Sequence, residues 1–293
     1  MPQVAIIHGE NRRDIVRRAI EALPEETFAK LASARSVVVK PNLVHHLNQL
    51  ASSHVDAVRG VIDVIRSKSS APIIVADASY HGTKAAFRHF GYENLPKEYP
   101  DVRLFDLNDD ETVPGTYLKR DGSLGEMGIA KTIANADFTV DLTVMKTHRD
   151  VGVSLTVKNW TIGTWVAKPR IGVTGRYWPR FPYLHEQGND KHHETIAELL
   201  RQTKPDLGVI DATLAMEGNG PTRGTPIAMD LALAGTDLVA VDATACRLMG
   251  IDPASIRYLA LASQRGYGVM DEALISPIGE ADWKRYAKEF VRT

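Results

Sequence analysis

The chain has 293 residues, of which 44% are hydrophobic and 24% charged, and its formal net charge is −1. This length suffices for two domains or one large one, and the near-neutral charge argues against a general role at nucleic-acid or membrane surfaces. The single cysteine, Cys246, can form no internal disulfide and cannot alone hold an iron–sulfur cluster. No secretory signal pattern and no apolar stretch of roughly 20 residues occurs, so we expect a cytoplasmic protein without a membrane partner.

Short apolar runs alternate with helix-like segments in the first half of the chain. We expect a helix that Asn11 caps and that runs to about Leu23. The other expected elements of this half are strands at 4–7, 36–39, 73–75 and 102–107 and helices at 55–65 and 83–90. This rhythm predicts parallel strands with crossover helices. Residues 109–123, rich in Asp, Gly and Pro, are expected to form an excursion or hairpin.

The second half continues the pattern after an expected helix at 124–136. Further expected elements are strands at 138–145, 207–210 and 229–234, helices at 195–202, 237–249, 253–263 (with Asp252 as its cap) and 284–291, and a stretch without clean periodicity at 149–185. The fold class is therefore α/β, with a largely parallel sheet and crossover helices. It can divide into two lobes with a cleft: 1–123, and 124–293 carrying an active-site segment and lid at 146–185.

Polar residues stand where predicted strands end. Lys40, Asp77, Lys146 and Asp211 each follow a strand directly, and Ser79 lies beside Asp77. Ligands of open α/β sheets bind at the carboxyl ends of the strands, so we expect a polar site there. Pro41 holds Lys40 extended, which would aim Lys40 and Asn42 at an anion, although a plain strand-to-loop exit would have the same sequence.

The segment from Lys146 to Asn159 combines groups that suit chemistry. Lys146 would be a base or nucleophile if it is desolvated in a cleft, but not at a solvated rim. His148 could move protons, bind a metal or be structural. Lys158 and Asn159 continue a stretch of small and hydroxyl residues that favours a phosphate or carboxylate. The glycine spacing of a Walker loop is missing.

Residues 151–185 contain no acidic residue but five cations and three of the four tryptophans. This basic, aromatic stretch could be a lid over an anion, a nucleic-acid patch at 158–180, or a homo-oligomer interface at 160–183. His185, His192 and His193 could supply metal ligands together with His148, although their spacing matches no standard motif, and the preferred set is His148, His185 and His193. The loop 216–221 could place Glu217 as an acid/base and Asn219 against a substrate, or be an ordinary turn.

These motifs together resemble a known family. Lys40-Pro41-Asn42, the segment from Lys146 to Asn159, the 216–221 loop and the segments 234–237 and 239–243 resemble the domain of unknown function 362 family (DUF362), over about residues 4–265. Many members of that family carry ferredoxin-like cysteine clusters. This chain lacks those cysteines, so we expect no iron–sulfur cluster.

A more distant resemblance is to lactate racemase and its relatives, in which a histidine precedes by ten residues a lysine that carries a nickel-pincer nucleotide. His148 and Lys158 have this spacing, with Gly152 and Ser154 between them. The metal-binding histidine expected some sixteen residues after the lysine is replaced by Thr174, so His185 or His193 would have to substitute. The resemblance implies the fold and the site's location more directly than it implies the cofactor.

We therefore expect an enzyme that acts on a small carboxylate or phosphate by isomerase- or racemase-like proton or hydride transfer. Lys40, Asn42 and Asn159 would hold the anion, with Asp77, Ser79 and Asn219 as further contacts. His148 would be the acid/base, assisted by Lys146 and Glu217, and Lys158 a second cation or a covalent attachment point. One alternative is an accessory protein without turnover that binds a divalent metal or a metal-containing nucleotide. The other is a nucleic-acid-binding protein that uses residues 158–180.

Overall fold

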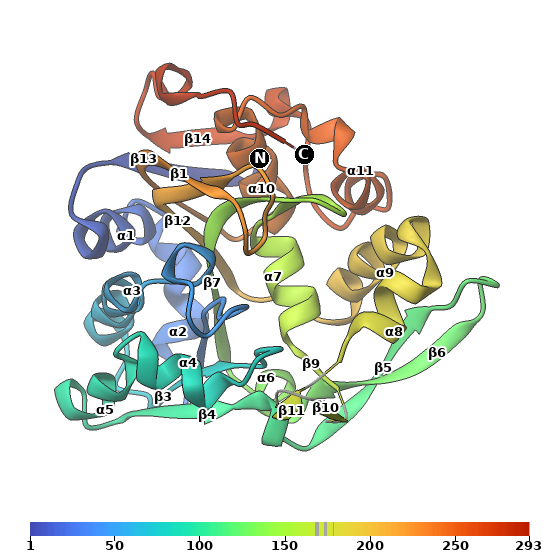
Figure 1. Cartoon of the computed structure of the whole chain (residues 1–293). Coiled ribbons are helices and arrows are strands. Elements are labelled where there is room, and N and C mark those ends of the chain that lie inside the picture. Colours follow the sequence, from blue (N-terminus) through green and yellow to red (C-terminus); the bar gives the residue numbers. More distant parts are fainter. Residues whose placement is uncertain (168–169, 173–174, 178, 293) are drawn as a thin grey trace.

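The computed structural model describes residues 1–167, 170–172, 175–177 and 179–292. Within these residues a nine-stranded sheet runs through the molecule in the order β14-β1-β13-β12-β7-β2-β3-β4, with β8 paired to β7 (Figure 1). Its strands are β1 (Gln3–His8), β2 (Val37–Lys40), β3 (Ile73–Asp77), β4 (Val102–Asp106), β7 (Phe138–His148), β8 (Gly152–Ser154), β12 (Leu207–Glu217), β13 (Thr225–Gly235) and β14 (Ser276–Gly279). Strands β12, β7, β2, β3 and β4 are mutually parallel, whereas β13 is antiparallel to both β12 and β1. The predicted α/β class with a largely parallel sheet is confirmed.

Helices cover both faces of the sheet, as Figure 1 shows. One face packs against α1 (Arg12–Glu21), α3 (Val55–Lys68), α4 (Thr83–His89) and α5 (Leu95–Glu98), and the other against α7 (Thr156–Gly163), α9 (Asn189–Gln202), α10 (Leu238–Leu248) and α11 (Arg257–Gln264). The alternation of strand side chains separates the two cores: Val37 and Val39 join the first, and Val38 joins the second. Both faces of the central strands are therefore apolar, which explains their continuous hydrophobic runs. Short helices α2 (Ala29–Ala32), α6 (Lys131–Ala134) and α8 (Phe181–Leu184) lie in the connections.

A smaller sheet, formed by β5 (Thr112–Leu118), β6 (Leu124–Ala130) and β9 (Trp165–Val166), projects from the main body (Figure 1). The excursion or hairpin predicted at 109–123 is confirmed as the first strand and turn of the β5–β6 hairpin. The helix predicted at 124–136 is wrong over 124–130, and only the short α6 at 131–134 is helical. Leu124 and Glu126 are exposed whereas Gly125 and Met127 are buried, and this two-residue period is that of a strand. Strands β10 (Arg170–Gly172) and β11 (Gly175–Tyr177) form a separate hairpin.

Two predictions near the C-terminus also need correction. The helix predicted at 284–291 is only a 3-10 turn, Trp283–Tyr286, after which the chain is extended and the Val291 carbonyl accepts from the Gly218 amide at 2.7 Å. Asp252 caps the 3-10 turn Pro253–Ser255, and α11 begins only at Arg257.

The parallel half of the sheet contains strands from both sides of residue 123, because β2 pairs with β7. The two predicted lobes thus share one sheet, and a division into lobes stays a prediction. No helix in the described part of the chain is long and apolar enough to span a membrane.

Candidate active site

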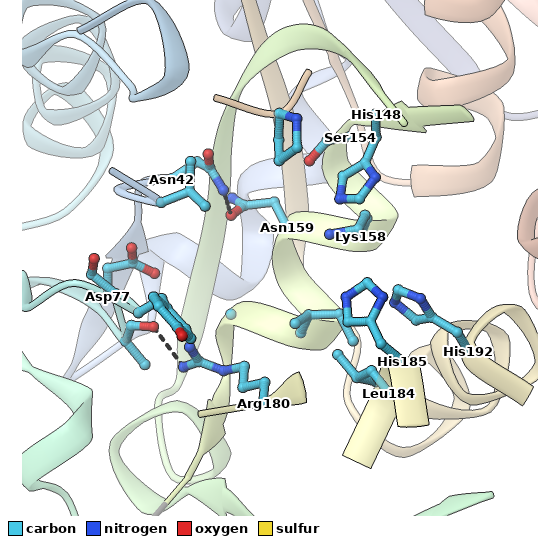
Figure 2. A pocket seen from close by; sticks show the side chains of 17 residues that line it. Asn42, Asp77, His148, Ser154, Lys158, Asn159, Arg180, Leu184, His185 and His192 are labelled. Atoms are coloured by element: carbon cyan, nitrogen blue, oxygen red, sulfur yellow. Dashed lines mark hydrogen bonds between the residues drawn. The ribbon is translucent and has the colours of Figure 1, made fainter. Parts of the chain in front are cut away.

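A cavity of about 280 Å³ opens at the carboxyl ends of β2, β3 and β7 (Figure 2). Its walls come from the loops after β2 and β3, the end of β7, strand β8, one side of α7, and the segment that leads into α9. The polar wall residues are Asn42, Asp77, Ser79, Tyr80, His148, Ser154, Lys158, Asn159, Arg180, His185 and His192. Segments more than 140 residues apart in sequence, from Asn42 to His192, therefore meet at the edge predicted for the site.

Helix α7 presents Lys158 and Asn159 to this cavity because hydrogen bonds to α10 hold its N-terminus in place. The carboxyl group of Asp242, on α10, accepts from the Thr156 amide at 2.8 Å, the Thr156 hydroxyl at 2.5 Å and the Val157 amide at 3.0 Å. Burial raises the pKa of Asp242 to about 7. These bonds satisfy N–H groups that have no partner within the helix and so set where α7 begins.

A buried network of lysines and asparagines lies beneath the cavity. The Lys40 ammonium is 2.8 Å from Asp77 Oδ1 and donates to Asn159 Oδ1 at 3.0 Å, an atom that also accepts from Asn42 Nδ2 at 2.5 Å. Lys146 donates to Asn42 Oδ1 and, at 2.5 Å, to the Ala51 carbonyl. Both ammonium groups are completely buried and neither lines the cavity. The two lysines thus hold the amide groups of Asn42 and Asn159, which do line it.

The pKa of Lys146 is lowered to about 7, first by burial and then by the positive charge of Lys158. The sequence prediction of a desolvated lysine at position 146 agrees with this environment. However, the Lys146 ammonium lies beneath the cavity and does not line it, so it would not contact a ligand bound there.

Lys158 is the ammonium that faces the cavity itself. Among the described residues it has no hydrogen-bond or ion-pair partner, and burial lowers its pKa to about 8. Asp150 opposes this shift through its negative charge without bonding the ammonium. An ammonium that lacks a partner inside a cavity favours an anionic ligand or, when neutral, acts as a base or nucleophile.

His148 lies beside Lys158 with a defined proton position. Its Nδ1 accepts from the Asp150 amide at 3.1 Å, so the neutral ring carries its proton on Nε2. Burial, and then the charge of Lys158, lower the pKa of His148 well below its ordinary value. His148 is therefore a neutral hydrogen-bond donor. Of the acid and base roles predicted from the sequence, this state favours the donor role.

His192 stands on the opposite side of the Lys158 ammonium from His148, next to His185 (Figure 2). Its ring packs edge-on against His185, with centroids 4.7 Å apart. His192 is buried, and neither of its ring nitrogens has a hydrogen-bond partner within the described chain. Burial also lowers its pKa strongly. The sequence offered His192 only as one of several possible metal ligands and the preferred set left it out, since two adjacent histidines before a helix carry no sign of which one faces inward.

Arg180 and Ser79 form another part of the wall. Nη2 of Arg180 donates to the carbonyls of Ala78 (2.5 Å) and Trp165 (2.9 Å). Its Nε and the hydroxyl of Ser79 are buried and have no partner among the described residues. Arg180 was predicted only as one cation of a lid, because nothing in its sequence context distinguishes it from its neighbours.

Three predicted site residues lie elsewhere. Glu217 accepts from the Val291 amide at 2.9 Å, Asn219 lines a separate groove with Arg149 and Arg223, and His193 stacks on Tyr258 with centroids 6.0 Å apart. Asp211 lies inside β12 rather than at its end and pairs with Arg12 at 2.8 Å.

The predicted metal set of His148, His185 and His193 is not brought together, because His193 points away from the cavity. In the part of the chain that the structure describes, no group of three or more His, Cys, Asp or Glu side chains is arranged to hold a metal ion. Thr174, where the racemase-like pattern has its metal-binding histidine, and Trp178 lie outside the described residues.

A model of the family described as "Domain of unknown function (DUF362)" matches residues 37–247. The chain belongs to the DUF362 family. The DUF362 match begins at β2 and ends in α10, so it includes every residue of the cavity wall, from Asn42 to Pro221.

Three further proteins are similar to this chain in sequence or in structure. A thylakoid-associated protein of Synechocystis is 24% identical over 246 residues, which cover 83% of this chain and 71% of the relative. The lactate racemase apoprotein of Thermoanaerobacterium thermosaccharolyticum superimposes with a TM-score of 0.54 and 16% identity over 84% of this chain. The DUF362 chain spans 57% of the length of that racemase chain, and the likeness shows a shared fold. A Thermotoga maritima protein has a TM-score of 0.45 and 10% identity, with 88% of this chain and 60% of that chain covered.

Proposed function

We propose that this DUF362 protein is an enzyme that transfers a proton or hydride next to the acid group of a small carboxylate or phosphate, in an isomerase-type reaction. The observation that carries the proposal is the placement of the unpartnered Lys158 ammonium in one cavity with the neutral rings of His148 and His192. The racemase fold of the similar structure adds support for the reaction class.

In this proposal the Lys158 ammonium binds the acid group, and Asn42 and Asn159 orient it. The charge of Lys158 and the carboxylate attract strongly because both are partly removed from water. Nε2–H of His148 donates to an oxygen of the substrate on which negative charge develops, which a neutral imidazole can do without carrying a charge into the cavity.

His192 supplies the opposite wall. Burial keeps the His192 ring neutral and a weak base, and the negative charge of a bound acid group would raise its basicity. One of its ring nitrogens, which have no partner among the described residues, can then accept or return a proton across Lys158 from His148 (Figure 2). A reaction that interconverts two configurations at one carbon needs such groups on both sides of the substrate.

The lactate racemase resemblance also implies a nickel-pincer nucleotide on the lysine. The unpartnered amine of Lys158 fits a covalent attachment, and the imidazoles of His185 and His192 are suitable metal donors on the same wall. When bound, that group would supply a hydride acceptor near the acid group. In that case His192 would hold the metal rather than move a proton, and the Nε2–H of His148 would donate to an oxygen of the substrate.

The test combines mass and turnover. Protein purified from its cells is weighed intact by mass spectrometry, then incubated with a panel of chiral 2-hydroxy and 2-amino carboxylates and phosphate esters. Chiral chromatography follows the interconversion of their stereoisomers. His148→Ala should lower the rate about 10²–10⁴-fold, whereas His89→Ala, an exposed histidine on α4, should leave it unchanged. Failure of every panel member to isomerise, with no thermal stabilisation by any small anion, would refute the proposal.

The nucleic-acid patch and the oligomer interface predicted for this region have weaker support. Lys158 and Arg180, two cations of the proposed nucleic-acid patch at 158–180, face the cavity, and Trp160 and Trp165 of the proposed oligomer interface are 1% exposed. A mass adduct that disappears in Lys158→Met without any turnover would instead favour the cofactor-binding accessory role. A cytoplasmic location stays a prediction.

A further inference from the structure

We propose that the ligand of this cavity is a dianion: one acid group binds at Lys158 and a second one at a separate subsite formed by Arg180 and Ser79. This inference rests on the proposed function and specifies the substrate class. The ligand would be a small dicarboxylate or a carboxylate that also carries a phosphate.

The first argument is the state of the polar atoms at this subsite. Arg180 is 8% exposed and Ser79 is 2% exposed, and both line the cavity. Nε of Arg180 and Oγ of Ser79 are buried without hydrogen-bond partners among the described residues. An unsatisfied buried donor costs about 1–3 kcal/mol and more when it is charged, so proteins rarely retain one unless a ligand completes it.

The second argument is charge. Asp77 and Asp106 both act to raise the pKa of Arg180, yet burial prevails and lowers it to about 10. Neither carboxylate bonds the guanidinium. Asp77 is held by Lys40 and the Leu43 amide, and Asp106 accepts from the Thr83 hydroxyl and the Asn108 amide. The positive charge of Arg180 is therefore left without a carboxylate partner among the described residues, and a ligand could supply one.

The third argument is position. Figure 2 shows Arg180 on the Asp77 side of the cavity, away from His148 and Lys158. The two cations nevertheless line the same cavity. A cavity of about 280 Å³ is below the roughly 300–1,000 Å³ of pockets for drug-sized molecules, so it suits a short ligand with an acid group at each end.

The bonding capacity of the two sites differs. Lys158 offers a single ammonium, whereas Arg180 still has the hydrogens of Nε and Nη1 to donate to an acid group, with Ser79 Oγ as a neighbouring unpartnered hydroxyl. The two hydrogens of Arg180 Nη2 are used by the Ala78 and Trp165 carbonyls, which fix the plane of the guanidinium. This fixed plane favours one orientation of the second acid group.

The experiment measures binding, not turnover. Isothermal titration at pH 7 compares succinate with succinamate, which has the same length but one charge fewer. Malonate, glutarate and 2-phosphoglycolate vary the length and the second acid group. Wild-type protein should bind the best dianion about 10–100-fold more tightly than succinamate. A better fit of 2-phosphoglycolate than of every dicarboxylate would identify the second group as a phosphate.

Variants test the assignment of the subsite. Arg180→Gln should reduce this preference to nearly one and leave the affinity for succinamate within about threefold, because Lys158 is untouched. Ser79→Ala, a smaller change, should lose about 3–10-fold for the dianion only. Arg103→Gln, an exposed arginine on β4, is the matched control. Thermal unfolding of each variant checks that it is folded.

Two results would overturn the inference: no dianion in the series preferred over succinamate, or a preference that survives in both Arg180→Gln and Ser79→Ala. The outcomes also separate the two proposals. Isomerisation without a dianion preference removes this subsite only, and a preference that depends on Arg180 without any isomerisation removes the enzymatic proposal only.

Discussion

Lys158 is expected to destabilise the folded protein, and its replacement should reveal how much. Its pKa falls from the ordinary 10.5 to about 8 in the folded chain. At about 1.4 kcal/mol per pH unit, this difference corresponds to about 3.5 kcal/mol of folding free energy. Because Lys158 has no partner in the described chain to leave unsatisfied, Lys158→Met should raise the free energy of unfolding at pH 7. The gain should be at most about 3 kcal/mol, since cavity water screens part of the charge.

The pH dependence gives the sign of this effect. A lysine whose pKa is depressed by folding opposes folding fully below its folded pKa of about 8. The penalty shrinks as pH rises from there and vanishes above 10.5, where both states are neutral. The advantage of Lys158→Met should therefore be largest at pH 7 and nearly gone at pH 10.

Urea unfolding at pH 7 and pH 10 measures both values. Lys97→Met, an exposed lysine on α5, is the control and should change stability by less than about 0.5 kcal/mol at either pH. The reasoning fails if Lys158→Met is no more stable than wild type at pH 7, or if its advantage is as large at pH 10. Inorganic phosphate should stabilise the wild type and not the variant, which links the stability penalty to the anion site.

Two further predictions concern the support of the site. In Gly163→Ala the new methyl would overlap the Lys40 ammonium, which Asp77 and Asn159 hold in place. The free energy of unfolding measured in urea should fall by about 3 kcal/mol. Helix propensity alone would raise it by about 1 kcal/mol, so a rise would contradict the steric argument. Asp242→Asn should cost about 1–3 kcal/mol by leaving donors of α7 unsatisfied. The folded pKa of Asp242, about 7, lies above its ordinary 3.8, so the stability it contributes is lost as pH rises between these values. Unfolding measured from pH 5 to pH 8 should thus show the variant's deficit narrowing, and a deficit that grows with pH would exclude this account.

Local sequence patterns predicted helices and strands correctly where a segment carries a single hydrophobic period. The first half of the chain alternates clear apolar strands with amphipathic helices, and Asn11 caps α1 by accepting from the Asp14 amide as predicted. The residues that follow β2 and β3 were found because parallel strands end at one edge. Local patterns failed where the helical and the strand period both fit a segment, as in β6. Its glycines and its alternating burial suit a strand, but this strand forms only by pairing with β5 and β9. The strand predicted at 229–234 lies within β13, but its antiparallel direction was not predicted, since pairing direction is decided between segments.

The sequence by itself determined the α/β class, the family, and the importance of the segment that contains His148 and Lys158. Only the tertiary structure decided which charged groups face a ligand. It placed Lys40 and Lys146 beneath the cavity and Glu217 and Asn219 away from it. It also brought in Arg180 from the stretch without clean periodicity and His192 from the first turn of α9. The physical reason is that desolvation and partner satisfaction depend on atoms contributed by several distant segments, and no local pattern along the chain encodes such an arrangement.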